Sequence, residues 1–138
     1  MLPIQDSLLR LMLATLIGFL IGLTRKNKPA GLRTFALISL GSAIFTLISI
    51  ENLDSDKSRV ISQIVTGIGF LGAGVIWKQG FKLSGLTTAA AIWVTAAIGV
   101  MIGLGFWVEA LVGALLTIMV LFSKRIFVKA GLEEEGGQ

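Results

Sequence analysis

The chain has 138 residues, of which 54% are hydrophobic and 14% charged, and its mean hydropathy is +0.88. This balance excludes an ordinary soluble domain and predicts an integral membrane protein. The absence of cysteine and histidine excludes disulfides, thiolate metal sites and the commonest general base. The net charge of +4 comes from basic residues that flank apolar segments, so we expect the lipid bilayer, and no nucleic acid, as partner.

Five apolar segments predict five membrane-spanning helices, because an apolar run of about 18 residues is long enough to cross the hydrocarbon core. We expect these helices over 8–23, 32–50, 60–77, 87–103 and 106–122. They predict an all-α integral membrane protein, a five-helix transmembrane bundle over residues 1–125. The remaining residues, 126–138, form a short tail that we expect to be cytoplasmic and disordered.

Small residues recur on single faces of these helices, which is typical of membrane helices whose backbones pack closely. The segment 60–77 carries two such faces, and this pattern favours a helix that lies between two neighbours. The glycines to which we assign a helix-packing role are Gly18, Gly22, Gly67, Gly69, Gly72, Gly74 and Gly99.

Polar side chains are few inside the predicted spans. Four hydroxyl residues share one face of the second helix: Ser39, Ser42, Thr46 and Ser49. Two interpretations stay open, hydrogen bonds back to the carbonyl four residues earlier or a face that meets another helix or water. Gln63 is the polar intramembrane candidate of the third span. Arg10 lies near one end of the first span, where we interpret it as reaching the lipid headgroups.

The loop charges predict the orientation of the chain, since loops rich in Lys and Arg remain in the cytoplasm. The loop between the first two helices has four basic residues, and the segments after the third and the fifth helix are also basic. The segments on the other side are acidic or uncharged. We therefore expect the N-terminus outside and the C-terminus in the cytoplasm.

Two short sequences occur twice. Ile-Gly-Phe-Leu at 17–20 recurs at 68–71, and Gly-Leu-Arg-Thr at 31–34 resembles Gly-Leu-Thr-Thr at 85–88. These matches predict a parallel internal repeat in which the first pair of helices is equivalent to the second pair.

This repeat would place two helix N-termini side by side at the cytoplasmic face, where unpaired N–H groups favour an anion. The site would bind a phosphate, a lipid headgroup or a carboxylate of a partner. Its candidate residues are Arg25, Arg33, Thr34, Thr87 and Thr88. The alternative is that the threonines cap their helices and the arginines meet lipid phosphates.

Three segments carry a family resemblance: KPAGLRT (28–34), SRVISQIVTGIGFLGAGVI (58–76) and GLTTAAAIWVTAAIG (85–99). Together they resemble the membrane domain of the MgtC/SapB family. The resemblance implies several spans in the inner membrane of a bacterium. Some members add a cytoplasmic domain that resembles an ACT fold, and we expect only the N-terminal transmembrane domain here. The family is linked to survival in low magnesium, virulence, acid resistance and regulation of other membrane proteins, including the ATP synthase.

One position departs from the family pattern. Where the resemblance implies a GLER-like stretch, the chain has GLTR at 22–25, so that Thr24 replaces an acidic residue. This change weakens any cation site in that loop. The family pattern is kept at Arg25, Arg33, Asp56 and Arg59, and Asp56 is the candidate metal ligand.

The resemblance implies a non-enzymatic membrane protein of magnesium or acid-stress homeostasis that binds and regulates other membrane proteins. We expect a homodimer or a higher homo-oligomer, without a cofactor other than Mg²⁺ as ligand or signal. The alternative is a transporter or channel for Mg²⁺ or another ion, formed by a homo-oligomer. The lack of an acid between Asp6 and Glu51 argues against a cation path. The usual catalytic constellations are also missing, so we expect no enzyme.

Overall fold

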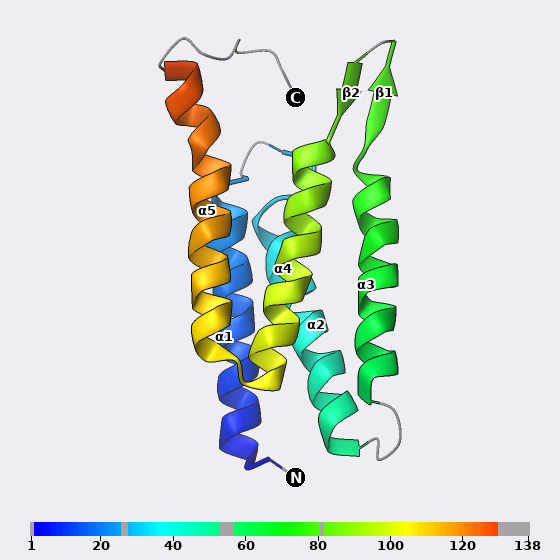
Figure 1. Ribbon diagram of the computed structural model, residues 1–138, viewed down its shortest axis with the longest axis vertical. Helices are drawn as coiled ribbons and strands as arrows, with labels where there is room; N and C mark the ends of the chain where they lie inside the picture. Colours follow the sequence, from blue (N-terminus) through cyan, green and yellow to red (C-terminus); the bar gives the residue numbers. More distant parts are fainter. Residues whose placement is uncertain (1, 26–27, 53–56, 81, 130–138) are drawn as a thin grey trace.

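The structure is a computed structural model that describes residues 2–25, 28–52, 57–80 and 82–129. Five helices form an elongated bundle (Figure 1): α1 (Ile4–Leu23), α2 (Leu32–Asn52), α3 (Lys57–Gly74), α4 (Leu86–Leu104) and α5 (Trp107–Lys129). Helices α1, α3 and α5 run in one direction, and α2 and α4 run in the other. The all-helical fold with five helices is therefore confirmed.

A short antiparallel hairpin joins α3 to α4. Strand β1 (Trp77–Gln79) pairs with β2 (Lys82–Ser84), and Gly80 turns between them with a φ of 59°. The predicted helix over 60–77 is wrong at its end, because α3 stops at Gly74 and Trp77 already belongs to the hairpin. We call the end of the bundle at which α2 and α4 begin the hairpin end, and the opposite end the N-terminal end.

The outer helices are longer than the apolar segments that predict them. Helix α1 begins at Ile4 and not at residue 8, and α5 continues to Lys129 and not to 122. The two helices include polar residues before the apolar run of α1 and after the apolar run of α5. The first four residues of the predicted tail, 126–129, are thus helical, and 130–138 lie outside the described residues.

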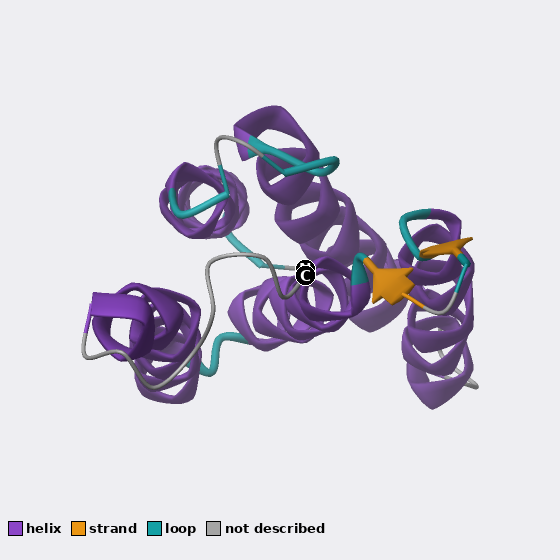
Figure 2. Ribbon diagram, turned by 90° about the horizontal axis from the view of Figure 1, so that it is seen from above, coloured by secondary structure: helices purple, strands orange, loops and turns teal. Residues whose placement is uncertain are grey.

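Helix α4 lies at the centre of the bundle and packs against each of the other four helices. Seen from above, it occupies the middle, with α3 and α5 on opposite sides (Figure 2). Its closest approach is to α2. An added Cβ at Gly99 would overlap the carbonyl oxygen of Ser39, and one at Gly103 would lie 2.7 Å from the Cβ of Thr46. Only glycine lets the two backbones come this near.

The hydroxyl face of α2 is the surface that meets these glycines. Ser39, Ser42, Thr46 and Ser49 are all buried. The hydroxyl of Thr46 also donates to the carbonyl oxygen of Ser42 at 2.7 Å. Both interpretations from the sequence therefore hold. The hydroxyl face meets another helix, and the hydroxyl of Thr46 on it bonds back to the carbonyl four residues earlier.

Two further glycines bring α1 against α2. An added Cβ at Gly18 would lie 2.5 Å from the carbonyl oxygen of Phe35, and one at Gly22 would lie 2.6 Å from the Cα of Leu32. At Gly72 of α3 the contact is looser, because the added Cβ would be 3.6 Å from the carbonyl oxygen of Ala89.

The remaining glycines of α3 make no such contact. An added Cβ at Gly67, Gly69 or Gly74 would meet no atom of the described residues within 4 Å. Helix α3 lies at the edge of the bundle, against α4 and to a smaller extent α2. The expectation that this helix is closely packed on two faces is therefore wrong for the single chain. Gly18 is tightly packed, whereas Gly69, its counterpart in the predicted repeat, is not. The packing of these two glycines therefore does not support the repeat, which stays a prediction.

Arg10 fixes the start of α1 to the turn between α4 and α5. Its Nη1 donates to the carbonyl oxygen of Gly103 at 2.6 Å, and its Nη2 lies 2.7 Å from Oδ2 of Asp6. The guanidinium also lies 5.4 Å from the ring centroid of Trp107. Arg10 is only 8% exposed, so the interpretation that it reaches out to lipid headgroups is wrong. Gly105, with a φ of 89°, leaves room for its guanidinium.

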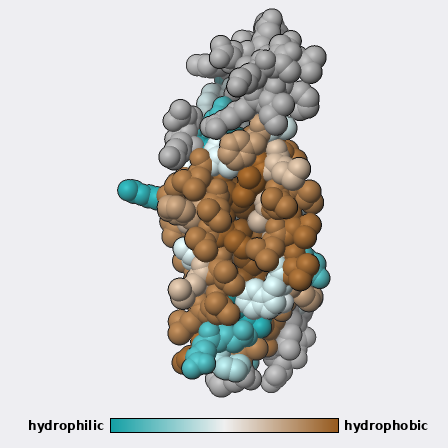
Figure 3. Space-filling model, turned by 90° about the vertical axis from the view of Figure 1, so that its left-hand side faces the viewer, coloured by the Kyte–Doolittle hydropathy of each residue, from teal (hydrophilic) through white to brown (hydrophobic). Residues whose placement is uncertain are grey.

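The surface has the character expected of a membrane protein. Three helices, α1, α2 and α4, are long and apolar enough to cross a membrane within the described residues, and a shorter apolar helix covers Trp107–Ser123. Hydrophobic side chains cover the middle of the face shown in Figure 3, with hydrophilic ones nearer the ends. Helix α3 is not among the three, because its first half carries charged, hydroxyl and amide side chains.

The contact between α2 and α4 predicts the effect of one methyl group. Gly99→Ala should lower the free energy of unfolding by about 1–3 kcal/mol, because the new Cβ forces two backbones apart. The matched variant Gly69→Ala should change it by less than about 0.5 kcal/mol, since its Cβ meets open space. Unfolding of the purified protein by SDS in mixed micelles, followed by circular dichroism, measures both. Equal losses would contradict the assigned contact.

The Arg10 contacts predict a second loss of stability. Arg10→Leu leaves the carboxylate of Asp6 without its ion pair and the carbonyl of Gly103 without its donor. We expect a loss of about 2–4 kcal/mol, the usual cost of breaking a buried charge-assisted contact. Arg33→Leu removes an exposed arginine and serves as the control. A thermal melt in maltoside detergent that gives the same midpoint for both variants would refute this role of Arg10.

Candidate functional site

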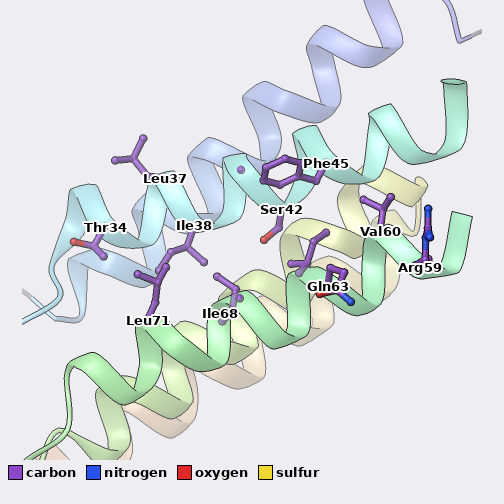
Figure 4. A pocket seen from close by; sticks show the side chains of 13 residues that line it. Thr34, Leu37, Ile38, Ser42, Phe45, Arg59, Val60, Gln63, Ile68 and Leu71 are labelled. Carbon is purple, nitrogen blue, oxygen red and sulfur yellow. The ribbon is translucent and has the colours of Figure 1, made fainter. Parts of the chain in front are cut away.

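A groove lies between α2 and α3. Its volume is about 910 Å³, and Figure 4 shows side chains from both helices pointing into it. Most of its lining is apolar. The larger apolar residues around it are Leu37, Ile38, Phe45, Val60, Ile64, Ile68 and Leu71.

Polar groups lie at defined places along this groove. Thr34 lies at the hairpin end, and Ser42 lies in the middle on α2 (Figure 4). Gln63 and Arg59 lie on α3 toward the other end. The groove therefore combines an apolar wall with an amide and a cation at one end, a pattern suited to a long apolar group that carries a polar segment.

Two glycines explain why the groove is open. Gly41 of α2 and Gly67 of α3 both line it, and an added Cβ at either would meet no described atom within 4 Å. The side chains that could bridge the two helices are thus missing from both walls. Helix α3 is instead held by α4, where Gly72 lies against Ala89.

The outward side of α3 is polar for a helix of this type. Ser62, Gln63 and Thr66 are exposed. The two hydroxyls bond back to their own helix, Ser62 to the carbonyl oxygen of Arg59 at 2.8 Å and Thr66 to that of Ser62 at 3.3 Å. The amide of Gln63 makes no hydrogen bond to the described residues. Gln63 and Gly67 also line the groove, whereas Ser62, Thr66 and Gly69 do not. We call the set Ser62, Gln63, Thr66, Gly67 and Gly69 the α3 face.

A second polar cluster lies at the hairpin end, where three helices meet. Arg25 follows the end of α1, and an added Cβ on Gly31 at the start of α2 would lie 3.9 Å from its carbonyl oxygen. The guanidinium of Arg25 crosses to the first turn of α4, where its Nη2 donates to the hydroxyl of Thr88. Arg25 is 7% exposed and Thr88 is 1% exposed. Burial lowers the pKa of the Arg25 guanidinium from its ordinary value because the charged form loses water.

One nitrogen of this buried guanidinium is unsatisfied. The Nε of Arg25 is shielded from solvent and has no hydrogen-bond partner among the described residues. The hydroxyl of Ser39 is in the same state, but it lies within the contact between α2 and α4 and is neutral. A buried cation with an unused donor is the costlier of the two.

The structure separates the residues that the sequence predicts for an anion site. It brings Arg25 and Thr88 together, and Thr87 lies half-buried beside them in the first turn of α4. Arg33 and Thr34 are exposed on the first turn of α2, and Thr34 lines the groove. The two arginines of the predicted site are thus in different surroundings.

The predicted metal ligand cannot be placed, because Asp56 lies outside the described residues. Within the residues that are described, no group of three or more His, Cys, Asp or Glu side chains could hold a metal ion. The carboxylates of the described part, Asp6, Glu51 and Glu109, lie at the N-terminal end of the bundle.

Sequence reasoning did not find the groove or the partners of Arg10. The available signal for the groove was the pair Gly41 and Gly67, small residues in the middle of two helices that are adjacent in the chain. For Arg10 the signal was Asp6, four residues earlier on the same helix, because this spacing favours an ion pair within a helix.

Comparison with known proteins places the chain among relatives. It is 46% identical over 111 residues to MgtC of Salmonella typhimurium strain LT2, covering 79% of this chain and 48% of that protein. It is 43% identical over 127 residues to YhiD of Escherichia coli strain K12, covering 84% and 59%. It is 42% identical over 130 residues to SrpB of Synechococcus elongatus, covering 81% and 71%.

The chain thus spans about half to seven-tenths of the length of these relatives. No solved structure matches it. A model of the MgtC family matches residues 11–130, which include nearly all of the five helices. These relatives and the three long apolar helices together identify a membrane protein of the MgtC type. The chain belongs to the MgtC family.

Proposed function

We propose that this chain is a multi-pass protein of the bacterial inner membrane that serves magnesium or acid-stress homeostasis by binding and regulating another membrane protein. The surface that we assign to this contact is the α3 face together with the groove beside it. The family membership and the name of the relative MgtC support the general role. The partner-binding mode rests on the geometry of α3.

The proposal includes five spans, with the N-terminus outside and the C-terminus in the cytoplasm. Helix α3 has 18 residues and α5 has 23, so each is long enough to reach across a hydrocarbon core of about 30 Å with little or no tilt or thinning. Nine of the twelve basic residues belong to the segments 25–33, 78–82 and 124–129, which supports this orientation.

The observation that carries the proposal is the exposed amide of Gln63, which makes no hydrogen bond to the described residues. In lipid, an amide such as that of Gln63 lacks a hydrogen-bond partner and is costly to expose. The glycines beside it, Gly67 and Gly69, allow another backbone to approach closely. A helix of a second protein that offers hydrogen-bond acceptors would satisfy both features at once.

Charge favours a different protein over a second copy of this chain at that face. In a dimer whose two-fold axis lies along the membrane normal, parallel copies of α3 would place each Arg59 near its counterpart. Like charges that face each other disfavour such pairing. We therefore assign the α3 face to a partner that offers hydrogen-bond acceptors to Gln63, and leave the proposed homo-oligomer to another surface.

Ion transport is the alternative function. It is favoured by the groove, with Ser42 and Gln63 as polar groups at depth, and by the name of the relative YhiD, which proposes magnesium transport. Against it stands the placement of the described carboxylates at one end of the bundle, because Mg²⁺ is bound by carboxylate oxygens and retained water.

Site-directed cross-linking tests the assigned face, and the absence of cysteine makes each label unique. Gly69→Cys carrying a photo-cross-linker should capture one membrane protein in living bacteria. Leu115→Cys on α5, which is 60% exposed, is the matched control and should capture lipid. Capture should be lost in Gly67→Leu, which fills the groove but changes the stability of the isolated chain by less than about 0.5 kcal/mol.

The captured protein must also change in activity when this chain is deleted. A cross-link to a second copy of the chain would contradict the assignment of the α3 face to a different protein. The assignment would also be contradicted if Leu115→Cys captured the same protein equally well, or if Gly69→Cys still captured it in the presence of Gly67→Leu.

Flux measurement separates binding from transport. Purified, folded protein in liposomes should give no Mg²⁺ uptake above empty liposomes, because a path with carboxylates at depth is missing from the described chain. Gln63→Leu and Asp56→Asn are the control variants. Uptake that saturates with Mg²⁺ and falls in either variant would establish transport and overturn the proposal.

A further inference from the structure

No carboxylate of the described residues compensates the positive charge of Arg25. Arg25 is 7% exposed, and its described side-chain partner is the neutral hydroxyl of Thr88. Its Nε is shielded and unpartnered among the described residues. Taking a guanidinium out of water in this way is costly unless an anion is nearby.

The neighbouring helix end adds to this imbalance. Thr88 lies in the first turn of α4, where unpaired N–H groups create a partial positive charge. A cation beside this end of a helix is repelled, whereas a cation at the other end is attracted. The described carboxylates are Asp6, Glu51 and Glu109, and all of them lie at the opposite end of the bundle.

The residue before α4 cannot supply the missing acceptor. Gly85 has no side chain, and no side-chain hydrogen bond caps the helix. Its φ of 93° and the overlap that a Cβ would make with the carbonyl oxygen of Val75 both require glycine here. A side chain of the usual capping type is therefore excluded at position 85, so that a cap from this position cannot occupy the helix end.

We propose that Arg25, Thr88 and the first turn of α4 bind one phosphate group. Its oxygens would accept from the unpartnered Nε of Arg25 and from the backbone N–H groups of Leu86 and Thr88, and they would neutralise both positive charges. The hydroxyl of Thr88 accepts from Arg25 and retains its own proton to donate. The most exposed residue of this turn is Leu86, at 45%, and Thr87 beside it is half-buried.

A tetrahedral phosphate suits this arrangement better than a carboxylate. The donors come from two directions, a guanidinium after α1 and backbone N–H groups of α4, and the several oxygens of a phosphate can meet both at once. The same chemistry is present in inorganic phosphate and in the headgroup of an anionic lipid. This proposal is independent of partner binding at the α3 face, and the two can fail separately.

The test is a thermal melt of the purified full chain in maltoside detergent, which contains no phosphate. One arm adds inorganic phosphate and the other adds dioctanoyl phosphatidylglycerol, each against sodium chloride of equal ionic strength. Either probe should raise Tm in a saturable way. Since the site is buried, the effect should persist at about 0.3 M chloride, at which exposed charges are screened.

Three variants assign the response to the site. Arg25→Gln should raise the half-saturating concentration at least about tenfold, as expected for loss of a charge-assisted hydrogen bond. Thr88→Val, which keeps the shape of the side chain, should raise it about three- to tenfold. Arg33→Gln removes an exposed arginine at the same end of the bundle and should leave the half-saturating concentration unchanged.

Each outcome decides the proposal. A response to inorganic phosphate that depends on Arg25 supports a site for free phosphate, and a response to the lipid alone supports a headgroup site. If Arg25→Gln does not fold, Arg25→Lys and Thr88→Val take its place, and an unchanged half-saturating concentration in both overturns the proposal. A response that is absent, or that falls equally in Arg33→Gln, overturns it as well.

Discussion

The close approach of α2 and α4 is the constraint on which the rest of the bundle depends. It requires glycine at positions 99 and 103, where any side chain would enter the backbone or a side chain of α2. It also explains why hydroxyl residues, and not larger apolar ones, line the facing surface of α2, since they are small and can bond to their own helix. With these two helices in contact, α4 becomes the central element, and α1, α3 and α5 are arranged around the pair.

Much of the fold could be predicted from the sequence because the signals are local. Five apolar runs, each long enough to cross a membrane, predict the five helices. The spacing of small residues locates the close contacts at Gly18, Gly22 and Gly99. The pattern does not say which face meets which helix, so Gly67, Gly69 and Gly74 were assigned the same role although no described residue covers them. The hairpin was missed because three-residue strands are too short to show a periodicity.

The candidate site was predictable only in part. The sequence identifies Arg25 and Thr88 as charged and capping residues near two helix starts, but it gives Arg33 the same weight. The difference between the two arginines comes from tertiary packing. Gly22 brings α1 close to Leu32, and Arg25, which follows shortly after α1, is buried, whereas Arg33 is exposed. The contact of Arg10 with Gly103 joins residues 93 positions apart, and no local pattern indicates such a pair.

The groove beside α3 has a consequence for how any partner would bind. In a bilayer, an apolar groove that opens sideways is filled by lipid chains and not by water. Association is then an exchange reaction, in which a helix replaces acyl chains along Gly41 and Gly67. Its equilibrium depends on how well those chains pack there and on their entropy when they are released. The fluidity and the chain composition of the membrane would therefore set the occupancy of the α3 face, with no change in the protein itself.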